Sequence, residues 1–447
     1  MRSMKVRIWR TVAGVAVLAL GLAACGSDAE EGGDQAALAV EPAGEDEQVE
    51  LTVWFGRAEF IPDDAFETFH DEHPNIRVNA DVIPLEQIPA DFIRVQDAGN
   101  TPDIIQPDSG DVGILSLRGL LLDITEILEI WEEEDPDLYN AMTDTAWDLA
   151  SYQGVPYGLA LHHGVYWANY RPDVLDDLGL DVPTTWDEVL EVGKVISEET
   201  DMYGYTLNAS RDQTPEWDKA IFAQMGGQWV DGVMQIDSEV GHYWLNWYQR
   251  AMEDGVIDPD TIAYAWPDLI RNFSQGQAAM AIISRNVFVQ DIAPDLDYGT
   301  EWLIRPEPWV KPGSEDDARY ITQGWPYFVS AATEHPYEVG LVLRYLADDE
   351  QAFSVAERYQ PVSNSRVMGS AEYLEGAPWG EDMLEPWDNL EVRPFHPNQA
   401  AMDEVIRDAM QEALTDTTAD VEEMAARYQQ QLDDLADEIP DPEAEEE

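Results

Sequence analysis

Cysteine and basic residues are scarce in this chain of 447 residues. Its single cysteine, Cys25, excludes a framework of disulfide bonds. Lys and Arg together number 24 against 91 Asp and Glu, which gives a formal net charge of −67 at pH 7. A chain this acidic repels nucleic acid and anionic lipid surfaces, so we expect neither as a binding partner.

The acidity does not predict disorder. Hydrophobic residues make up 45% of the chain and aromatic residues 10%, including 16 Trp, which is enough to build large cores. Domains average roughly 150 residues, so the length predicts two or three structural units. No period of 20–50 residues recurs, which argues against a solenoid or a propeller.

Long apolar runs are also missing. The longest, residues 12–22, is too short to span a bilayer comfortably, and it follows four basic side chains: Arg2, Lys5, Arg7 and Arg10. It ends in Leu22-Ala23-Ala24-Cys25, which resembles a bacterial lipobox. We therefore predict a lipoprotein signal peptide over residues 1–24 and a lipid on Cys25; an ordinary signal peptide is the alternative. Cleavage would remove four cations and no acid, leaving a charge of −71.

Both ends of the remaining chain are acidic and poor in large apolar residues. Residues 25–48 are predicted to form a flexible tether that holds the folded part off a membrane. Residues 441–447 are predicted to be an acidic tail. The folded body therefore lies between them.

Strand and helix patterns alternate at the start of the body. Strands are predicted at 50–55, 75–78 and 102–106, and helices within 62–73 and 83–99. This rhythm predicts an α/β architecture, in which the carboxyl ends of parallel strands face the crevice that binds ligands. Farther on, Thr185 and Glu188 form a capping box that opens a helix through residue 196. An apolar face near the chain end predicts a last helix: Val421, Met424, Ala425, Tyr428, Leu432 and Leu435.

Four groups of short motifs follow one another along the body. They are Leu51-Thr52-Val53-Trp54 with 73–78; 99–105 with 119–123; 154–158 with 169–173 and 183–188; and Gly226-Gly227, Phe273, 276–280 and Gly324-Trp325-Pro326. In this order they resemble the extracellular solute-binding proteins of ABC importers, in the sugar-binding group related to maltose-binding protein.

The resemblance implies a periplasmic-binding-protein-like fold of type II, with a ligand cleft between two α/β lobes joined by hinge strands. On this chain it places lobe 1 at 49–158 and 327–370, and lobe 2 at 159–326 and 371–440. It implies a sugar or oligosaccharide as ligand, an ABC permease as partner, and a location on the extracellular side of the cell membrane. It implies no cofactor and no catalytic step.

Sugar binding requires aromatic rings to stack on apolar ring faces, and charged or amide groups to bond hydroxyls. In the first lobe, Trp54, Arg57 and Glu59 follow the first predicted strand, and Asp108 and Asp111 follow the third. Family members place sugar contacts after the third strand, and we expect these side chains at the rim of the cleft. A solvated surface position is the alternative for each carboxylate.

His162 and His163 lie just past the first predicted hinge, where the resemblance implies a ligand contact. Burial in the core or exposure at the surface is the alternative. Adjacent histidines lack the i, i+4 spacing of a helical zinc site, so we expect no metal.

The candidates in the second lobe and at the hinge are mostly tryptophans. They are Trp217, Trp229, Trp266, Arg285, Trp325 and His396. Ser284-Arg285-Asn286 follows the Phe273–Met280 motif, and the resemblance implies that this turn reaches the cleft. Core packing is the alternative for any single Trp, but the set exceeds what a core of this size needs.

Two other functions remain open from the sequence. A secreted glycoside hydrolase also places paired carboxylates near Trp residues, although no pair stands out here. A peptide- or polyamine-binding protein of the same fold would require a carboxylate-rich cleft to bind the cationic groups of its ligand. The leading interpretation is a membrane-tethered sugar-binding subunit without enzymatic activity.

Overall fold

The computed structural model describes residues 40–438, except 45, 63, 65, 97–99, 212, 214, 285–286, 315, 359–360 and 388–389. The predicted signal peptide, Cys25, most of the tether and the acidic tail lie outside the described residues, as does Arg285. The described residues belong to one compact unit. The end of the predicted tether is part of this unit, and the backbone N–H of Ala43 donates a hydrogen bond to Glu338 at 2.7 Å.

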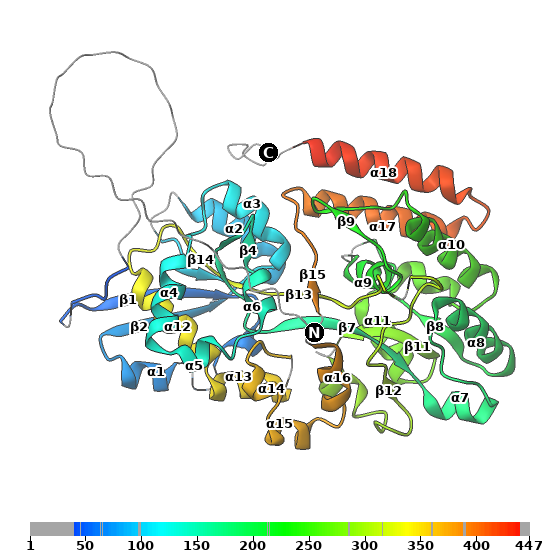
Figure 1. The fold of residues 1–447 in the computed structure, drawn as a ribbon, viewed down its shortest axis with the longest axis horizontal. Helices are drawn as coiled ribbons and strands as arrows, with labels where there is room; N and C mark the ends of the chain where they lie inside the picture. Colours follow the sequence, from blue (N-terminus) through cyan, green and yellow to red (C-terminus); the bar gives the residue numbers. More distant parts are fainter. Residues whose placement is uncertain are drawn as a thin grey trace, which may run out of the picture. The chain divides into compact units, whose positions relative to one another are not determined.

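Two large β-sheets organise the described chain (Figure 1), beside two small ones that pair β4 (Ser151–Tyr152) with β5 (Val155–Pro156) and β9 (Trp229–Val230) with β10 (Val233–Met234). The five strands of the first sheet lie in the order β2 (Ile76–Val82), β1 (Val49–Phe55), β3 (Ile104–Ile105), β14 (Tyr327–Val329) and β6 (Gly158–Leu159). β1 pairs in parallel with both β2 and β3, as strands joined by helical crossovers do. β14 and β6 complete the sheet in antiparallel pairings.

The second sheet has six strands. Its order is β15 (Glu391–Val392), β13 (Ile321–Gly324), β7 (His163–Tyr170), β11 (Ala278–Ser284) and β8 (Tyr203–Thr206), with β12 (Leu303–Ile304) also paired to β7. Every residue of β7 and β11 is buried. Helices must therefore cover both faces of this sheet.

Helices cover both faces of the first sheet and form the first lobe. Its helices are α1 (Glu67–Glu72), α2 (Ile88–Val95), α3 (Val112–Leu117), α4 (Thr125–Glu134), α5 (Pro136–Tyr139), α6 (Asp144–Asp148), α12 (Pro336–Ala347), α13 (Asp349–Arg358) and α14 (Ser365–Met368). Apolar residues of α1, α4 and α12 pack on one face, and those of α2 and α3 on the other. The buried apolar residues of α13 and α14 belong instead to the core under the second sheet, and only the partly buried Val355 reaches the core of the first.

The second lobe contains the remaining helices. They are α7 (Pro172–Leu178), α8 (Trp186–Glu199), α9 (Glu216–Gln224), α10 (Glu239–Glu253), α11 (Trp266–Ser274), α15 (Ala371–Gly376), α16 (Gly380–Trp387), α17 (Gln399–Thr415) and α18 (Val421–Asp437). One core joins the sheet to α8, α9, α10, α17 and α18, and another joins it to α11, α15 and α16. In Figure 1, α10, α17 and α18 lie together, and α17 contacts both of the others.

Neighbouring segments of the chain connect the two sheets. The chain passes from β6 to β7 through residues 160–162, and from β13 to β14 through Trp325 and Pro326. A third segment runs beside the first, since the N–H of His163 donates to the carbonyl of Pro361 at 3.2 Å. Glycine is required at Gly158, where an added Cβ would lie 2.2 Å from the carbonyl oxygen of Tyr327.

The predicted elements are present, with two corrections to their starts. The helix expected within 62–73 begins only at Glu67, because Phe66 has a left-handed backbone (φ 69°) that cannot continue a helix, and the carboxylate of Asp64 accepts hydrogen bonds from the N–H groups of Phe66 and Thr68 there. The helix expected within 83–99 begins at Ile88, with a proline in its first turn. The capping box of Thr185 and Glu188 and the last helix are confirmed. No helix in the described part of the chain is long and apolar enough to cross a membrane.

Candidate functional site

A cavity of about 560 Å³ lies between the two lobes. Its first-lobe lining comes from the segments that follow β1 and β3 and from α2 and α3, and its second-lobe lining comes from β7, β11, β13 and the starts of α9, α11 and α17. Small-molecule sites typically measure about 300–1,000 Å³ and lie in such crevices outside the carboxyl ends of parallel strands. This interlobe cavity is the candidate site.

Asp108 and Asp111 line the first-lobe wall of the cavity. They begin and end the short 3₁₀ turn that follows β3, and the carboxylate of Asp108 accepts a hydrogen bond from the N–H of Gly110 at 2.9 Å. Ser109, between them, is buried, and its hydroxyl accepts a 3.5 Å hydrogen bond from the N–H of Gly324 on β13. The turn is therefore fixed on both sides.

Both carboxyl groups hold their protons more tightly than usual. Burial, followed by the negative charge of Glu216, raises the pKa of Asp108 to about 6. Burial, followed by the charge of Asp108, raises the pKa of Asp111 to about 8. At neutral pH Asp111 is therefore mostly protonated and can donate a hydrogen bond as well as accept one.

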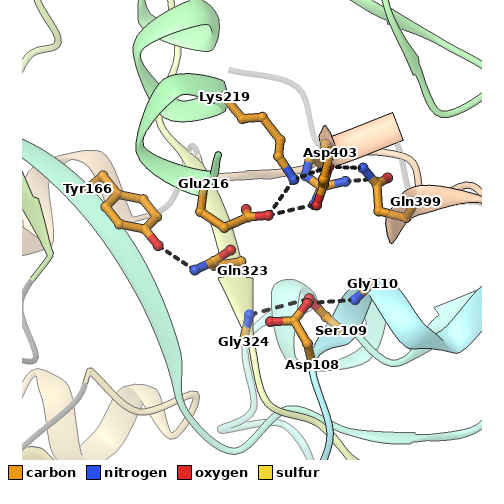
Figure 2. Close-up of polar contacts among 11 residues, drawn as sticks. Asp108, Ser109, Gly110, Tyr166, Glu216, Lys219, Gln323, Gly324, Gln399 and Asp403 are labelled. Carbon is orange, nitrogen blue, oxygen red and sulfur yellow. Dashed lines mark hydrogen bonds and ion pairs between the residues drawn. The ribbon is translucent and has the colours of Figure 1, made fainter. Parts of the chain in front are cut away.

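The second-lobe wall contains a ring of five polar side chains, which we call the polar ring. Its members are Glu216, Lys219, Arg393, Gln399 and Asp403. Lys219 bonds Glu216 and, at 2.9 Å, Asp403; Gln399 donates to Asp403 at 2.6 Å. Arg393 closes the ring by donating to Gln399 at 2.8 Å and to Glu216 at 3.3 Å. Figure 2 shows Asp108 across from the labelled members of the ring.

Aromatic rings face the same cavity. Trp217, in the first turn of α9, lies with its ring centroid 4.9 Å from that of Tyr166 on β7, and Tyr166 is held by Gln323 (Figure 2). Trp266 begins α11 and is 39% exposed, so much of its face is open to a ligand. Trp325 is largely buried, and the guanidinium of Arg57 lies 5.5 Å from its ring centroid.

The arrangement is suited to binding a polyhydroxylated molecule. Stacking surfaces, carboxylates and guanidinium groups meet in one crevice, which are the groups that hold apolar ring faces and hydroxyls. Within the described residues, no three or more His, Cys, Asp and Glu side chains are grouped so that they could hold a metal ion.

The cavity thus brings together six of the residues predicted from the sequence. They are Arg57, Asp108, Asp111, Trp217, Trp266 and Trp325. Ser284, from the turn predicted to reach the cleft, also lines it. For all of them, direct ligand contact stays a prediction.

Four predicted residues lie elsewhere. Trp54 is packed in the core beneath α2 and α3, and Glu59 is exposed on a 3₁₀ turn away from the cavity lining. The ring of Trp229 packs edge-on against Phe222 at 5.3 Å. His396 is adjacent to the lining residue Pro397 but does not line the cavity itself. Their role in binding stays a prediction that the cavity geometry does not favour.

His162 and His163 are buried in the segment that crosses between the lobes. His162 stacks on Phe60 at 3.8 Å and lies 3.1 Å from the side-chain amide of Gln106. Burial lowers the pKa of each imidazole to about 3, so both are neutral at pH 7. Neither lines the interlobe cavity, and this position matches the core alternative considered for the pair.

Sequence reasoning missed most of the second-lobe wall. Tyr166, Glu216, Gln323, Arg393, Gln399, Asp403, Glu404 and Arg407 line the cavity without having been predicted. One signal was available in the sequence: Lys219 is one of only three lysines beyond residue 24, and the apolar residues Ala220 to Ala223 follow it directly. A lysine that enters a core with such a stretch requires acidic partners nearby.

Comparison with known proteins gives one family match. Residues 57–353 match the model of the family described as bacterial extracellular solute-binding proteins. An arabinooligosaccharide-binding protein of Halalkalibacterium halodurans is 23% identical over 198 residues, which cover 42% of this chain and 43% of that protein. A putative binding protein of Brucella abortus is 23% identical over 241 residues, covering 52% and 56%. The chain spans about half the length of these curated relatives.

Solved structures share the two-lobed fold along most of the chain. The sugar-binding protein MalE of Xanthomonas citri superposes with a TM-score of 0.73 at 16% identity, covering 87% of this chain and 98% of that one. The maltose-bound MalE3 of T. maritima gives 0.71 at 20% identity, covering 87% and 100%. These likenesses confirm the predicted two-lobed α/β fold.

Proposed function

Because the chain belongs to the family of bacterial extracellular solute-binding proteins, we propose that it is the binding subunit of an ABC importer. It captures a sugar or oligosaccharide in the interlobe cavity and delivers it to the permease. The observation that carries this proposal is a single crevice lined from both lobes by Trp217, Trp266 and Trp325 together with carboxylates and guanidinium groups.

Binding is coupled to the position of the lobes. A ligand in this cavity touches Asp108 and Asp111 on one side and the polar ring on the other, so it favours the closed arrangement over an open one. The crossing segments provide the hinge. The closed, loaded form is the state that a permease would recognise.

The relatives support a saccharide ligand. One curated relative is an arabinooligosaccharide-binding protein, and one structural neighbour is maltose-bound. The family and these neighbours are binding proteins, which supports capture without chemistry rather than glycoside hydrolysis. We also propose that a lipid on Cys25 anchors the protein to the outer side of the cell membrane; mass spectrometry showing an unmodified Cys25 or cleavage at another residue would refute this part.

Thermal-shift screening tests the proposed function. The purified protein is heated with maltotriose, arabinotriose, monosaccharides, peptides and polyamines, and sugar products are measured by chromatography. We expect an increase in melting temperature with a saccharide and no product. Product release would instead indicate a hydrolase, and stabilisation by polyamines or peptides alone would indicate a different class of ligand.

A further inference from the structure

The polar ring shares its hydrogen bonds unevenly between carboxylate oxygens. Lys219 and Arg393 both bond Oε1 of Glu216, and Lys219 and Gln399 both bond Oδ1 of Asp403. The described residues supply no hydrogen bond to Oε2 of Glu216 or Oδ2 of Asp403. Both carboxylates line the cavity, and each therefore keeps one oxygen available to a ligand.

Lys219 brings these two acceptors together. Its side chain is completely buried and does not line the cavity, yet its ammonium bonds both carboxylates. α9 and α17 carry the two acids, and the shared ammonium keeps them close without exposing a positive charge to a ligand. Lys219 can therefore hold the two carboxylates in place from the side that faces away from the cavity.

The charges within the polar ring balance. Two cations offset two carboxylates, which is the condition under which buried charges are tolerated. Burial opposes ionisation of Glu216, but the charges and hydrogen bonds of Lys219 and Arg393 outweigh it and leave its pKa below the usual value. The ring therefore presents Glu216 as a fixed acceptor that carries no proton at neutral pH.

We propose that Oε2 of Glu216 and Oδ2 of Asp403 accept hydrogen bonds from hydroxyl groups of a neutral saccharide, and that Lys219 is the positioning residue for both. This inference rests on the proposed function and specifies its ligand class. Asp108 and Asp111 face the ring from the first lobe. Six carboxyl groups but only three guanidinium groups line the cavity among the described residues, so an anionic sugar meets an excess of acid and is disfavoured, whereas hydroxyls can donate to the carboxylates.

The test compares three variants with the wild-type protein by calorimetric titration from pH 5 to 8. Lys219→Met removes the shared ammonium, and Asp403→Asn keeps the size of the side chain but removes its charge. Lys194→Met is the matched control, because Lys194 pairs with Asp254 on the exposed surface at 2.6 Å. The probes are maltotriose and arabinotriose, with trigalacturonate as the anionic probe.

We expect Lys219→Met and Asp403→Asn to weaken binding of the neutral probe by about tenfold or more at pH 7, a change that corresponds to about 1.4 kcal/mol. In Lys219→Met the ratio of variant to wild-type Kd should rise further as the pH falls to 5, because Glu216 loses its main counter-charge and takes up a proton. The groups facing Glu216 are Asp108, Tyr166 and Arg393, which the variants retain. The charge of Lys219 also lowers the pKa of Asp108, so in Lys219→Met both carboxyl groups take up protons at higher pH than in the wild type.

A structural role for Lys219 alone would lower the melting temperature but leave that ratio independent of pH. If Lys219→Met does not fold, Asp403→Asn decides the question. The inference would be overturned if the wild type binds a neutral probe and Asp403→Asn binds it with the same affinity. Tight binding of trigalacturonate by the wild type would also overturn it. Either result would leave the proposed function standing. A wild-type protein that binds neither neutral probe would overturn the ligand role of the ring together with the proposed sugar specificity.

Discussion

Asp111 gives the candidate site a dependence on pH. Its folded pKa is about 8, raised by burial and by neighbouring carboxylates, whereas in an unfolded chain its pKa is near the usual value of 3.8. Between these values the unfolded state loses its proton first, so this group lowers stability progressively as the pH rises from about 4 to about 8. Asp108, with a folded pKa of about 6, acts in the same direction.

We therefore expect Asp111→Asn to reduce the fall in melting temperature of the ligand-free protein between pH 5 and pH 8. The amide cannot ionise, so the variant should gain stability relative to the wild type as the pH rises. Asp137→Asn, at an exposed position in α5, is the control and should leave the profile unchanged. Parallel profiles for Asp111→Asn and the wild type would contradict the prediction.

Trp217 is the aromatic side chain for which the geometry best supports stacking on a sugar. It begins α9 beside Glu216, packs next to Tyr166 and lines the cavity while remaining partly exposed. We expect Trp217→Ala to weaken saccharide binding by about 1–3 kcal/mol, as loss of a binding hot spot does. Titration calorimetry measures this, with Trp229→Ala as the control because Trp229 does not line the cavity. Equal affinities for both variants would count against a stacking role for Trp217.

Single residues differ in how far the sequence could place them. Arg57, Asp108 and Asp111 were predictable because they follow strands whose carboxyl ends meet at one rim. Glu216 and Asp403 lie 187 positions apart, and nothing local in the sequence brings α9 to α17. Such pairs depend on tertiary packing, which periodicity does not encode.

At the level of elements, the start of α8 combines a local signal with a long-range contact. The hydroxyl of Thr185 accepts a hydrogen bond from the N–H of Glu188 at 3.2 Å, and the carboxylate of Glu188 accepts one in return from the N–H of Thr185. The next residue, Trp186, is completely buried against Trp247 and Trp309. The capping box therefore fixes the start of α8, and with it the direction in which the side chain of Trp186 points into the core.

Thr185→Ala should remove this cap and lower stability by about 1 kcal/mol, the usual cost of losing such a residue. The expected result is a lower melting temperature with saccharide affinity unchanged, because α8 does not line the cavity. Thr300→Ala, at an exposed loop position, is the control for loss of a threonine hydroxyl. A variant as stable as the wild type would show that packing of Trp186 alone sets the helix start.

The early strands and helices were predictable because their hydrophobic patterns are local. The strand β14 was not, since its pairing with β3 and β6 joins residues more than 160 positions apart in sequence. The late start of α1 was missed because Phe66 takes a left-handed backbone and Asp64 accepts local N–H bonds within a stretch whose pattern is helical. Capping competes with helix continuation, and the sequence pattern alone does not show which prevails.

At the scale of the whole molecule, periodicity did not reveal that the chain crosses between two sheets. That expectation came from the order of the short motifs, which extends along nearly the whole body. The boundaries predicted for the lobes stay a proposal, and parts of α13 and α14, within the stretch assigned to lobe 1, pack under the second sheet. Helices near a hinge can contribute to both cores.

The excess of acid over base acts on the whole molecule rather than on the cavity. With 91 Asp and Glu against 24 Lys and Arg, most carboxylates have no cation to pair with, and their mutual repulsion destabilises the compact state. Salt shortens the range of this repulsion, from about 10 Å at 0.1 M to about 3 Å at 1 M. Salt also screens surface ion pairs such as Arg94 with Asp91, but little stability is lost in this way, because exposed pairs contribute only about 0–1 kcal/mol.

We therefore expect the melting temperature to rise as NaCl is increased from 0.05 to 1 M. Sucrose at matched osmolality separates screening from a general effect of excluded cosolutes, since sucrose carries no charge. A rise with NaCl that exceeds the rise with sucrose supports repulsion among carboxylates as the cause. A melting temperature indifferent to salt would mean that the charges are spaced widely enough for water alone to screen them, and would refute repulsion among carboxylates as a limit on stability.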